Sequence, residues 1–311
     1  MMANRHWAVL LLTAALFGSA FMFIKIAVAE VPPITIAAAR VAMAAPLVWA
    51  FLRATGERLP STARGWAPLI VLGFLTGVIP YTAIAWGQQY IASGLAGILF
   101  GTIPVFSVLL APAFITDERL TPGRLFGAFV GLAGVVTVVG PDALAGLEAQ
   151  LLGATVTVLA ALSYALGGIY SRRRGDLAPA AMAAGQLIVA TLILVPLSLV
   201  VDTAWTLTPS PLALWALAAT AVLCTAAPIV LLFWLIRQVG ASNGSLVAFF
   251  IPVVAVSLGS TLLAEALPWP VIAGLGMILF GAAVISGRVR LSRPARSLGS
   301  ADGGAEPDPR P

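Results

Sequence analysis

Pro80-Tyr-Thr-Ala-Ile-Ala-Trp86 has a counterpart in Pro228-Ile-Val-Leu-Leu-Phe-Trp234, which begins 148 residues later in the chain. A further proline follows each stretch at the same distance, as Pro104 and Pro252. All of these residues lie in or beside long apolar runs. Chance similarity between apolar runs is one explanation. Proline and tryptophan are uncommon enough, however, that their shared spacing favours a duplicated, proline-interrupted segment.

The composition indicates that this chain is surrounded mostly by lipid. Of its 311 residues, 60% are hydrophobic and 9% are charged, whereas soluble domains carry roughly 25% charged residues. The formal charge of +5 comes from arginines between apolar runs, which form no basic face, so we expect no nucleic-acid partner. The single cysteine, Cys224, excludes an internal disulfide, and the sequence has no cluster of metal-ligating residues. We therefore expect no metal and no cofactor.

Ten apolar runs are long enough to cross a bilayer, which takes about 20 residues. Short links with turn-forming residues separate them. This pattern predicts an all-α integral membrane protein with ten transmembrane helices in two inverted five-helix repeats. The predicted spans are residues 7–29, 34–53, 67–88, 92–115, 123–140, 149–171, 179–201, 211–236, 242–264 and 270–287.

The first span also resembles a signal peptide, because Ala27-Val28-Ala29 has the small residues of a cleavage site. Its apolar stretch from Trp7 to Ile24 is longer than the usual signal-peptide core of about 7–15 residues, and Lys25 follows it directly. We therefore expect this segment to be retained as a membrane span.

Positive charges alternate from link to link. With the N-terminus in the cytoplasm, 15 of the 17 lysines and arginines fall in cytoplasmic segments, and the five opposite links contain none. Positive residues stay on the cytoplasmic side during insertion, so we expect both termini in the cytoplasm. The cytoplasmic cations are Arg5, Arg53, Arg58, Arg64, Arg119, Arg124, Arg172, Arg173, Arg174, Arg237, Arg288, Arg290, Arg293, Arg296 and Arg310.

The two predicted halves run in opposite directions through the membrane, because five spans is an odd number. Further residues match at nearly the same offset, among them Arg40 with Gln186 and Glu118 with Glu265. We divide the chain into a first repeat over 1–145, a second repeat over 146–290 and a polar tail over 291–311 that is expected to be disordered. Carriers built from inverted repeats place their substrate site between the halves, at broken helices.

Four prolines are predicted helix breaks, namely Pro80, Pro104, Pro228 and Pro252. Each removes a backbone donor inside a span and kinks the helix. The freed carbonyls need partners in the protein or in a water-filled cavity. A structural kink is the alternative for any single proline, but four prolines in paired positions favour a shared cavity.

Lys25 and Arg40 are the two cations that fall inside spans. A cation in the hydrocarbon region costs a few kcal/mol, so it is rare without a function. One interpretation is that both long side chains extend to the outer headgroups. The other is that they contact a carboxylate or phosphate of a solute. No acidic residue lies deep in a predicted span to neutralise them.

Polar aromatic and amide residues near the breaks are further candidates for substrate contact. Tyr81, Tyr164 and Gln186 lie deep in their predicted spans. Trp86 and Trp234 lie closer to the interfaces, where an aromatic belt is the ordinary explanation.

Energy coupling is left open by the sequence. Proton-driven carriers commonly relay protons through carboxylates or histidines within the membrane, and none is evident in the predicted spans. Uniport, exchange, or coupling at an edge carboxylate such as Glu30 are the alternatives.

The chain resembles the drug/metabolite transporter superfamily, EamA type. The resemblance rests on the two five-span repeats, Phe-Gly-Ser-Ala-Phe-Met-Phe-Ile-Lys at 17–25, Ala-Ala-Ala-Arg at 37–40 and Glu118 after span 4. It implies a bacterial inner-membrane carrier, often an exporter of amino acids or related metabolites, whose spans 1, 3, 4, 6, 8 and 9 line the path. It also marks Lys25 and Arg40 as family-like positions, whereas the second half has Ser171 and Gln186 there.

The leading hypothesis is a secondary transporter, not an enzyme, that exports amino-acid-like or other small metabolites by alternating access. Its expected partners are a small-molecule substrate and membrane lipid, with a homodimer as an open possibility. A membrane-embedded enzyme or flippase acting on lipid-linked substrates is the alternative, but no recognisable catalytic motif supports it. A receptor or scaffold without transport would not need paired broken helices.

Overall fold

Prolines in the links begin several helices, because proline at the first helical position has its φ angle already set and lacks an N–H that would go unbonded there. Pro33, Pro122, Pro179 and Pro211 are each the first residue of a helix. The computed structural model describes residues 3–115, 120–144, 147–174 and 177–289. The predicted tail over 291–311 and Glu118 lie outside the described residues.

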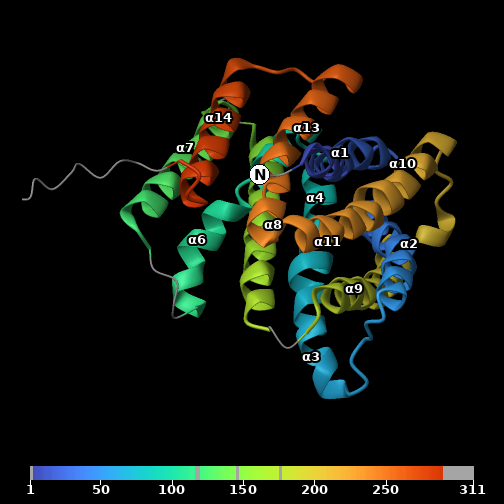
Figure 1. Ribbon diagram of the computed structural model, residues 1–311. Helices are drawn as coiled ribbons and strands as arrows, with labels where there is room; N and C mark the ends of the chain where they lie inside the picture. Colours follow the sequence, from blue (N-terminus) through green and yellow to red (C-terminus); the bar gives the residue numbers. More distant parts are fainter. Residues whose placement is uncertain (1–2, 116–119, 145–146, 175–176, 290–311) are drawn as a thin grey trace, which may run out of the picture.

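The described residues form helices and no strand. Figure 1 shows their arrangement. The elements are α1 (Asn4–Ala27), α2 (Pro33–Ala54), α3 (Ala63–Leu72), the π-helix η1 (Gly73–Val78), α4 (Ile79–Gly87), α5 (Ser93–Phe100), α6 (Ile103–Phe114), α7 (Pro122–Leu144), α8 (Glu148–Arg172), α9 (Pro179–Val201), the 3-10 turn η2 (Ala204–Thr206), α10 (Pro211–Ala221), the π-helix η3 (Val222–Ala226), α11 (Ala227–Val239), α12 (Ala241–Gly244), α13 (Val247–Leu262) and α14 (Trp269–Ile285).

Eight helical segments in the described part of the chain are long and apolar enough to cross a membrane, when α3–η1–α4, α5–α6 and α10–η3–α11 each count as one. The helices α13 and α14 are apolar but shorter, with 16 and 17 residues. The protein is therefore an all-α membrane protein. Ten crossings and two inverted repeats stay predictions.

Two helix pairs lie on opposite sides of the bundle, α7 with α14 and α2 with α9 (Figure 1). The first pair is close because glycines face each other across it. A Cβ atom on Gly127 would lie 2.7 Å from the carbonyl oxygen of Gly281, and one on Gly134 would lie 2.9 Å from that of Gly274. Glycine therefore lets the two backbones approach, as small residues do in membrane helix packing.

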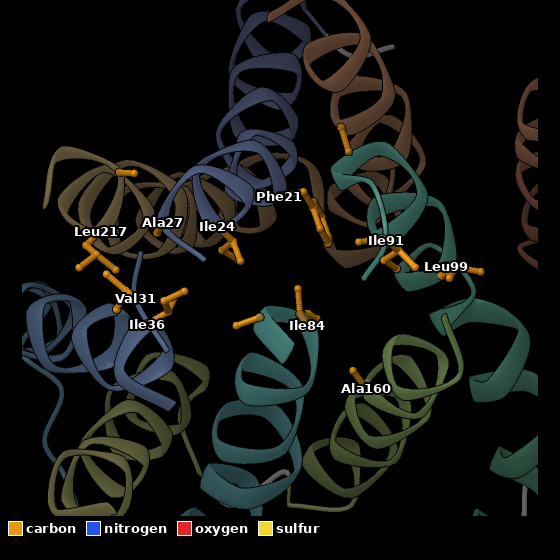
Figure 2. Close-up of a cluster of buried hydrophobic side chains, with 14 of the residues drawn as sticks. Phe21, Ile24, Ala27, Val31, Ile36, Ile84, Ile91, Leu99, Ala160 and Leu217 are labelled. Atoms are coloured by element: carbon orange, nitrogen blue, oxygen red, sulfur yellow. The ribbon is translucent and has the colours of Figure 1, made fainter. Parts of the chain in front are cut away.

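The central hydrophobic cluster draws on helices from both ends of the sequence (Figure 2). Phe21 and Ile24 of α1 pack there with Ile84 of α4, Leu99 of α5 and Leu217 of α10. These side chains point toward a common interior (Figure 2). The first and second halves of the chain thus share one core.

A π-helical turn lies at the same place in two membrane segments. Pro80 is the second residue of α4, directly after η1, and Pro228 is the second residue of α11, directly after η3. Proline cannot donate to the preceding turn, and a local π turn can re-satisfy the backbone groups that it leaves without partners in a membrane helix. The two prolines are 148 residues apart, and the two π turns also end 148 residues apart, at Val78 and Ala226.

The N-termini of these two segments match as well. The Thr62 side chain accepts a hydrogen bond from the N–H of Gly65 at the start of α3. The Ser210 side chain accepts one from the N–H of Ala213 at the start of α10. Both are N-caps, which satisfy a backbone donor that has no partner inside the helix.

Candidate functional site

Three cavities meet at Tyr164 of α8. The large cavity, of about 320 Å³, lies among α1, α6, α8, α11 and α13. The inner cavity, of about 50 Å³, adjoins it and shares Phe17, Phe100 and Ile251 with it in addition to Tyr164. The side cavity, of about 230 Å³, lies between η1, α8 and α9. The large cavity alone is of the size that holds a small molecule.

Arg40 lines the inner cavity and is only 7% exposed. Its Nε donates to the Thr225 hydroxyl at 2.8 Å, and its guanidinium carbon lies 4.0 Å from the centre of the Tyr81 ring. The cation–π contact and the hydrogen bond both stabilise the charge. The two terminal guanidinium nitrogens make no hydrogen bond to any residue that the structure describes. They are therefore available to a bound molecule.

The π turn η3 determines where Thr225 lies. The Thr225 hydroxyl donates to the Thr220 carbonyl at 2.8 Å, five residues earlier in the chain. With its proton used in this way, the hydroxyl oxygen accepts from Arg40. The interruption near Pro228 thus supplies the polar group that holds the buried cation.

Gln186 has a corresponding environment in the other half. The Thr76 hydroxyl, in η1, lies 2.6 Å from Gln186 Oε1. Gln186 lines the side cavity together with Thr76 and Tyr164. In each half, therefore, a threonine in a π turn contacts a polar residue of a helix from the opposite half.

Lys25 lies elsewhere. Its Nζ donates to the main-chain carbonyls of Gln88 at 2.7 Å and Ile91 at 2.9 Å, just beyond the end of α4. Cations near a helix C-terminus stabilise its last carbonyls. Lys25 lines none of the three cavities that meet at Tyr164, so of the two predicted intramembrane cations only Arg40 faces that space.

The two tryptophans also lie away from the cavities. Trp86 packs against Tyr90, with ring centres 4.8 Å apart. Trp234 is 37% exposed and lies 6.0 Å from the His6 ring. The structure therefore brings Arg40, Tyr81 and Tyr164 together with Gln186 beside them, and leaves Lys25, Trp86 and Trp234 outside this group.

Pro104 and Pro252 differ in their effect on the backbone. Pro104 follows a break at Gly101 and Thr102, between α5 and α6, and lines the large cavity. Pro252 lies inside the continuous helix α13, and the interruption in that segment comes earlier, between α12 and α13. The two prolines thus match in the sequence, but the helix is interrupted just before Pro104 and is not interrupted at Pro252.

At one end of the molecule, carboxylates bind helix N-termini across the two halves. We call this the carboxylate end. Glu265 accepts from the Ser93 N–H at 2.7 Å, the Ser93 hydroxyl at 2.9 Å and the Gly94 N–H at 3.0 Å, at the start of α5. Asp202 accepts from the N–H and the hydroxyl of Thr35, both at 2.8 Å, in the first turn of α2.

Glu30 is the third carboxylate at this end. It accepts from the Ser210 N–H at 2.6 Å and the Ser210 hydroxyl at 2.7 Å, where α10 begins. The hydrogen bond from the Ser210 backbone, followed by that from its side chain, lowers the pKa of the Glu30 carboxyl below its ordinary value. All three carboxylates therefore connect the halves through charge-assisted bonds.

We call the opposite end the arginine end, and it borders the large cavity of about 320 Å³, whereas a cavity of about 200 Å³ lies beside Glu265 at the carboxylate end. Here Arg237 Nη2 lies 3.1 Å from Glu57 Oε1, and the Arg237 side chain is 60% exposed. Ile236, Gly244 and Ser245, which lie at this end, line the large cavity. The internal space therefore extends from Arg40 toward the arginine end.

Several residues of this site were not among the predicted contacts. Thr225 and Thr76 lie three and four residues before the paired prolines Pro228 and Pro80, and threonine in such a position is a usable signal for a contact at a helix break. Phe17 and Phe100 carry no comparable signal, because phenylalanine is common in any apolar span.

An all-helical membrane protein with a buried cation facing a solute-sized internal cavity belongs to the class of polytopic membrane carriers. The sequence profile of the EamA-like transporter family matches residues 6–140 and again 151–287. The chain therefore belongs to this family, of the drug/metabolite transporter type, whose members are transporters and not enzymes.

Individual relatives agree with this assignment. The "Uncharacterized inner membrane transporter YedA" of Escherichia coli K12 is 27% identical over 277 residues, covering 87% of each chain. A "Probable terminal-alkyne amino-acid exporter" of Streptantibioticus cattleyicolor is 31% identical over 195 residues, covering 61% of this chain and 63% of the relative. A crystal structure with 19% identity has the same fold, with a TM-score of 0.65 over 91% of this chain and 96% of the other. The protein is thus a multi-pass membrane transporter of this family.

Proposed function

We propose that this chain is a secondary transporter that exports small metabolites, including amino-acid-like solutes, by alternating access between two inverted five-helix repeats. The observation that carries the proposal is Arg40, a buried cation with free donor groups at the centre of cavities formed by both halves. The resemblance to a relative named as a probable amino-acid exporter supports the solute class.

The proposed site consists of Arg40, Tyr81, Tyr164 and Gln186. Lys25 is proposed to act on the transport cycle instead, because its ammonium joins α1 to the end of α4 at the carboxylate end. At the carboxylate end, hydrogen bonds join the two halves, whereas the large cavity lies toward the arginine end. We therefore propose that the structure represents a state open toward the arginine end. The arginine distribution supports a cytoplasmic position for that end and for both termini.

The test of transport is solute flux. Purified protein in proteoliposomes would be loaded with a labelled extract of cell metabolites, and the released solutes would be identified. Arg40→Gln is expected to lower the release of the accepted solutes by about tenfold or more, since a charged hydrogen-bond partner contributes roughly 1.5–3 kcal/mol. Arg53→Gln, on the same helix but exposed at its end, is the matched control and is expected to retain flux. Equal rates for wild type and Arg40→Gln on every solute would contradict the proposed site.

Thiol labelling tests whether the protein is open toward the arginine end and whether that end faces the cytoplasm. Because Cys224 is the sole cysteine, a Cys224→Ala chain provides a background without thiols. A cysteine in place of Ala248, which lines the large cavity, is expected to react with an impermeant reagent in inside-out vesicles and to resist it in intact cells. The reverse pattern would contradict the proposed orientation.

A further inference from the structure

We infer that the central site selects apolar monoanions, that is, small carboxylates with a hydrophobic body and no compensating ammonium group. This rests on the proposed transport function and specifies its substrate class. Within the proposed range of small metabolites, it ranks such acids above amino acids, which are zwitterions. The inference follows from the charge of the cavities, the unused donors in them and the nature of their walls.

The charge of the site is uncompensated. Arg40 is the only ionised side chain among the described residues that line the three cavities, and no described carboxylate lines them. Lys25, which could otherwise add a second charge, has its ammonium on the carbonyls of Gln88 and Ile91. The empty site therefore carries one positive charge.

A buried charge is costly unless an opposite charge pairs with it. A monoanion bound at Arg40 leaves the site neutral, a zwitterion leaves one net positive charge, and a cationic amine leaves two. The cost of that excess charge grows as water is excluded, because the effective dielectric constant falls. Charge balance therefore ranks the anion first, the zwitterion second and the amine last.

The unused donors also suit an anion. Arg40 offers its terminal nitrogens, and the hydroxyls of Tyr81 and Tyr164 make no hydrogen bond to any residue that the structure describes. Both tyrosines line the inner cavity with Arg40. A carboxylate accepts hydrogen bonds from guanidinium and phenol groups, and has two oxygens with which to do so.

The walls around these donors are apolar. Phe17, Phe100 and Ile251 border both the inner and the large cavity. Leu232 and Ile236 continue the apolar surface toward the arginine end. A solute with its carboxylate at Arg40 would therefore place its remaining atoms against hydrocarbon, which favours a hydrophobic body.

The test uses three probes with the same phenyl body and different charge, namely 3-phenylpropanoate, phenylalanine and 2-phenylethylamine. Binding to the purified full-length protein would be measured by calorimetry at neutral pH, which avoids the leak of neutral acids through vesicles. The expected order of affinity is acid, then amino acid, then amine, with at least a tenfold difference between the first two. Equal or tighter binding of phenylalanine or the amine would overturn the inference.

Variants test whether Arg40 causes the preference for the acid over the amino acid and the amine. Arg40→Gln is expected to remove the preference for 3-phenylpropanoate, Arg40→Lys to retain it in part, and Arg53→Gln to leave it unchanged. If Arg40→Gln does not fold, the order of the three probes on the wild-type protein decides the matter. Absence of binding by all three probes would also overturn the inference, whereas the proposed function would still be judged by the metabolite flux assay.

Discussion

The carboxylate end and the arginine end differ in how they hold the two halves together. At the carboxylate end, Glu30, Asp202 and Glu265 each accept hydrogen bonds from a helix start in the other half. A carboxylate at a helix N-terminus benefits from the helix dipole as well as from the N–H donors. At the arginine end, Arg237 and Glu57 form an exposed ion pair, and such pairs contribute little.

This difference indicates at which end the two halves can move apart at the lower cost in free energy. The arginine end already contains the large cavity, so opening toward it needs little further change. Opening the carboxylate end requires the loss of several charge-assisted bonds at once. Under the alternating-access cycle proposed above, the three carboxylates would thus set the population of the state that opens on their side.

The largest effect is expected from Glu265→Ala. This substitution removes the acceptor of two backbone N–H groups and a hydroxyl, which shifts the conformational equilibrium by roughly 2 kcal/mol, or about 30-fold. With the orientation proposed above, the measurement is labelling from outside the cell of a cysteine in place of Ile84, in a Cys224→Ala background. Ile84 is 3% exposed and lines the inner cavity.

The control for this substitution is Glu57→Ala, which removes a carboxylate at the arginine end. It is expected to leave the labelling rate at Ile84→Cys unchanged. If both substitutions raise the rate equally, the two ends do not differ in the way that their contacts indicate.

A smaller effect is expected from Asp202→Asn. The amide oxygen can still accept from Thr35, but without the negative charge, so labelling at Ile84→Cys should rise several-fold. Thr35→Val removes the hydroxyl from the same contact. The two changes should be partly non-additive when combined, because they share one hydrogen bond, while the Thr35 hydroxyl also lies 2.9 Å from that of Ser198. Additive effects would show that Asp202 acts through another partner.

The third prediction concerns pH and Glu30. Because hydrogen bonds from Ser210 lower the pKa of this carboxyl, its contribution to stability is fully present above the ordinary pKa of glutamate. It is lost as the pH falls through the lower pKa of the folded state. Melting temperatures of wild type and Glu30→Gln should therefore differ at neutral pH and converge in acid. A difference that grows in acid would contradict the contact.

The smallest effect is expected from Arg237→Gln. The ion pair with Glu57 is exposed, so its loss should change stability by less than about 1 kcal/mol. The melting temperature in detergent should shift by no more than a few degrees, and metabolite flux should be retained. A loss comparable to that of Glu265→Ala would mean that the arginine end is held as firmly as the other.

The sequence was sufficient for the parts of this structure that depend on rare residues. Pro80 and Pro228 mark two similar interruptions, and Arg40 stands out because arginine is costly inside a span. Tyr81, found near it in the structure, was predicted because it follows one of those prolines.

Other contacts could not be predicted, since they depend on how distant helices are positioned against one another in the folded protein. Lys25 binds main-chain carbonyls 63 and 66 residues away, and every residue has a carbonyl, so no side-chain pattern reveals the pair. Thr225 reaches Arg40 through a π turn, which adds a residue that helical periodicity does not anticipate. Glu265 was matched with Glu118, but two of its three donors at Ser93 and Gly94 are backbone N–H groups, which no side-chain pattern reveals.

The π turns also make the two interrupted segments tolerant of one particular change in gene length. A π turn holds one residue more than an ordinary α turn. Deletion of one codon within Gly73–Val78 or Val222–Ala226 would therefore convert the π turn into an α turn and leave the flanking residues, Tyr81 among them, facing nearly the same directions. A deletion in a regular part of the same segments would instead rotate the residues on either side of it by about 100° relative to one another.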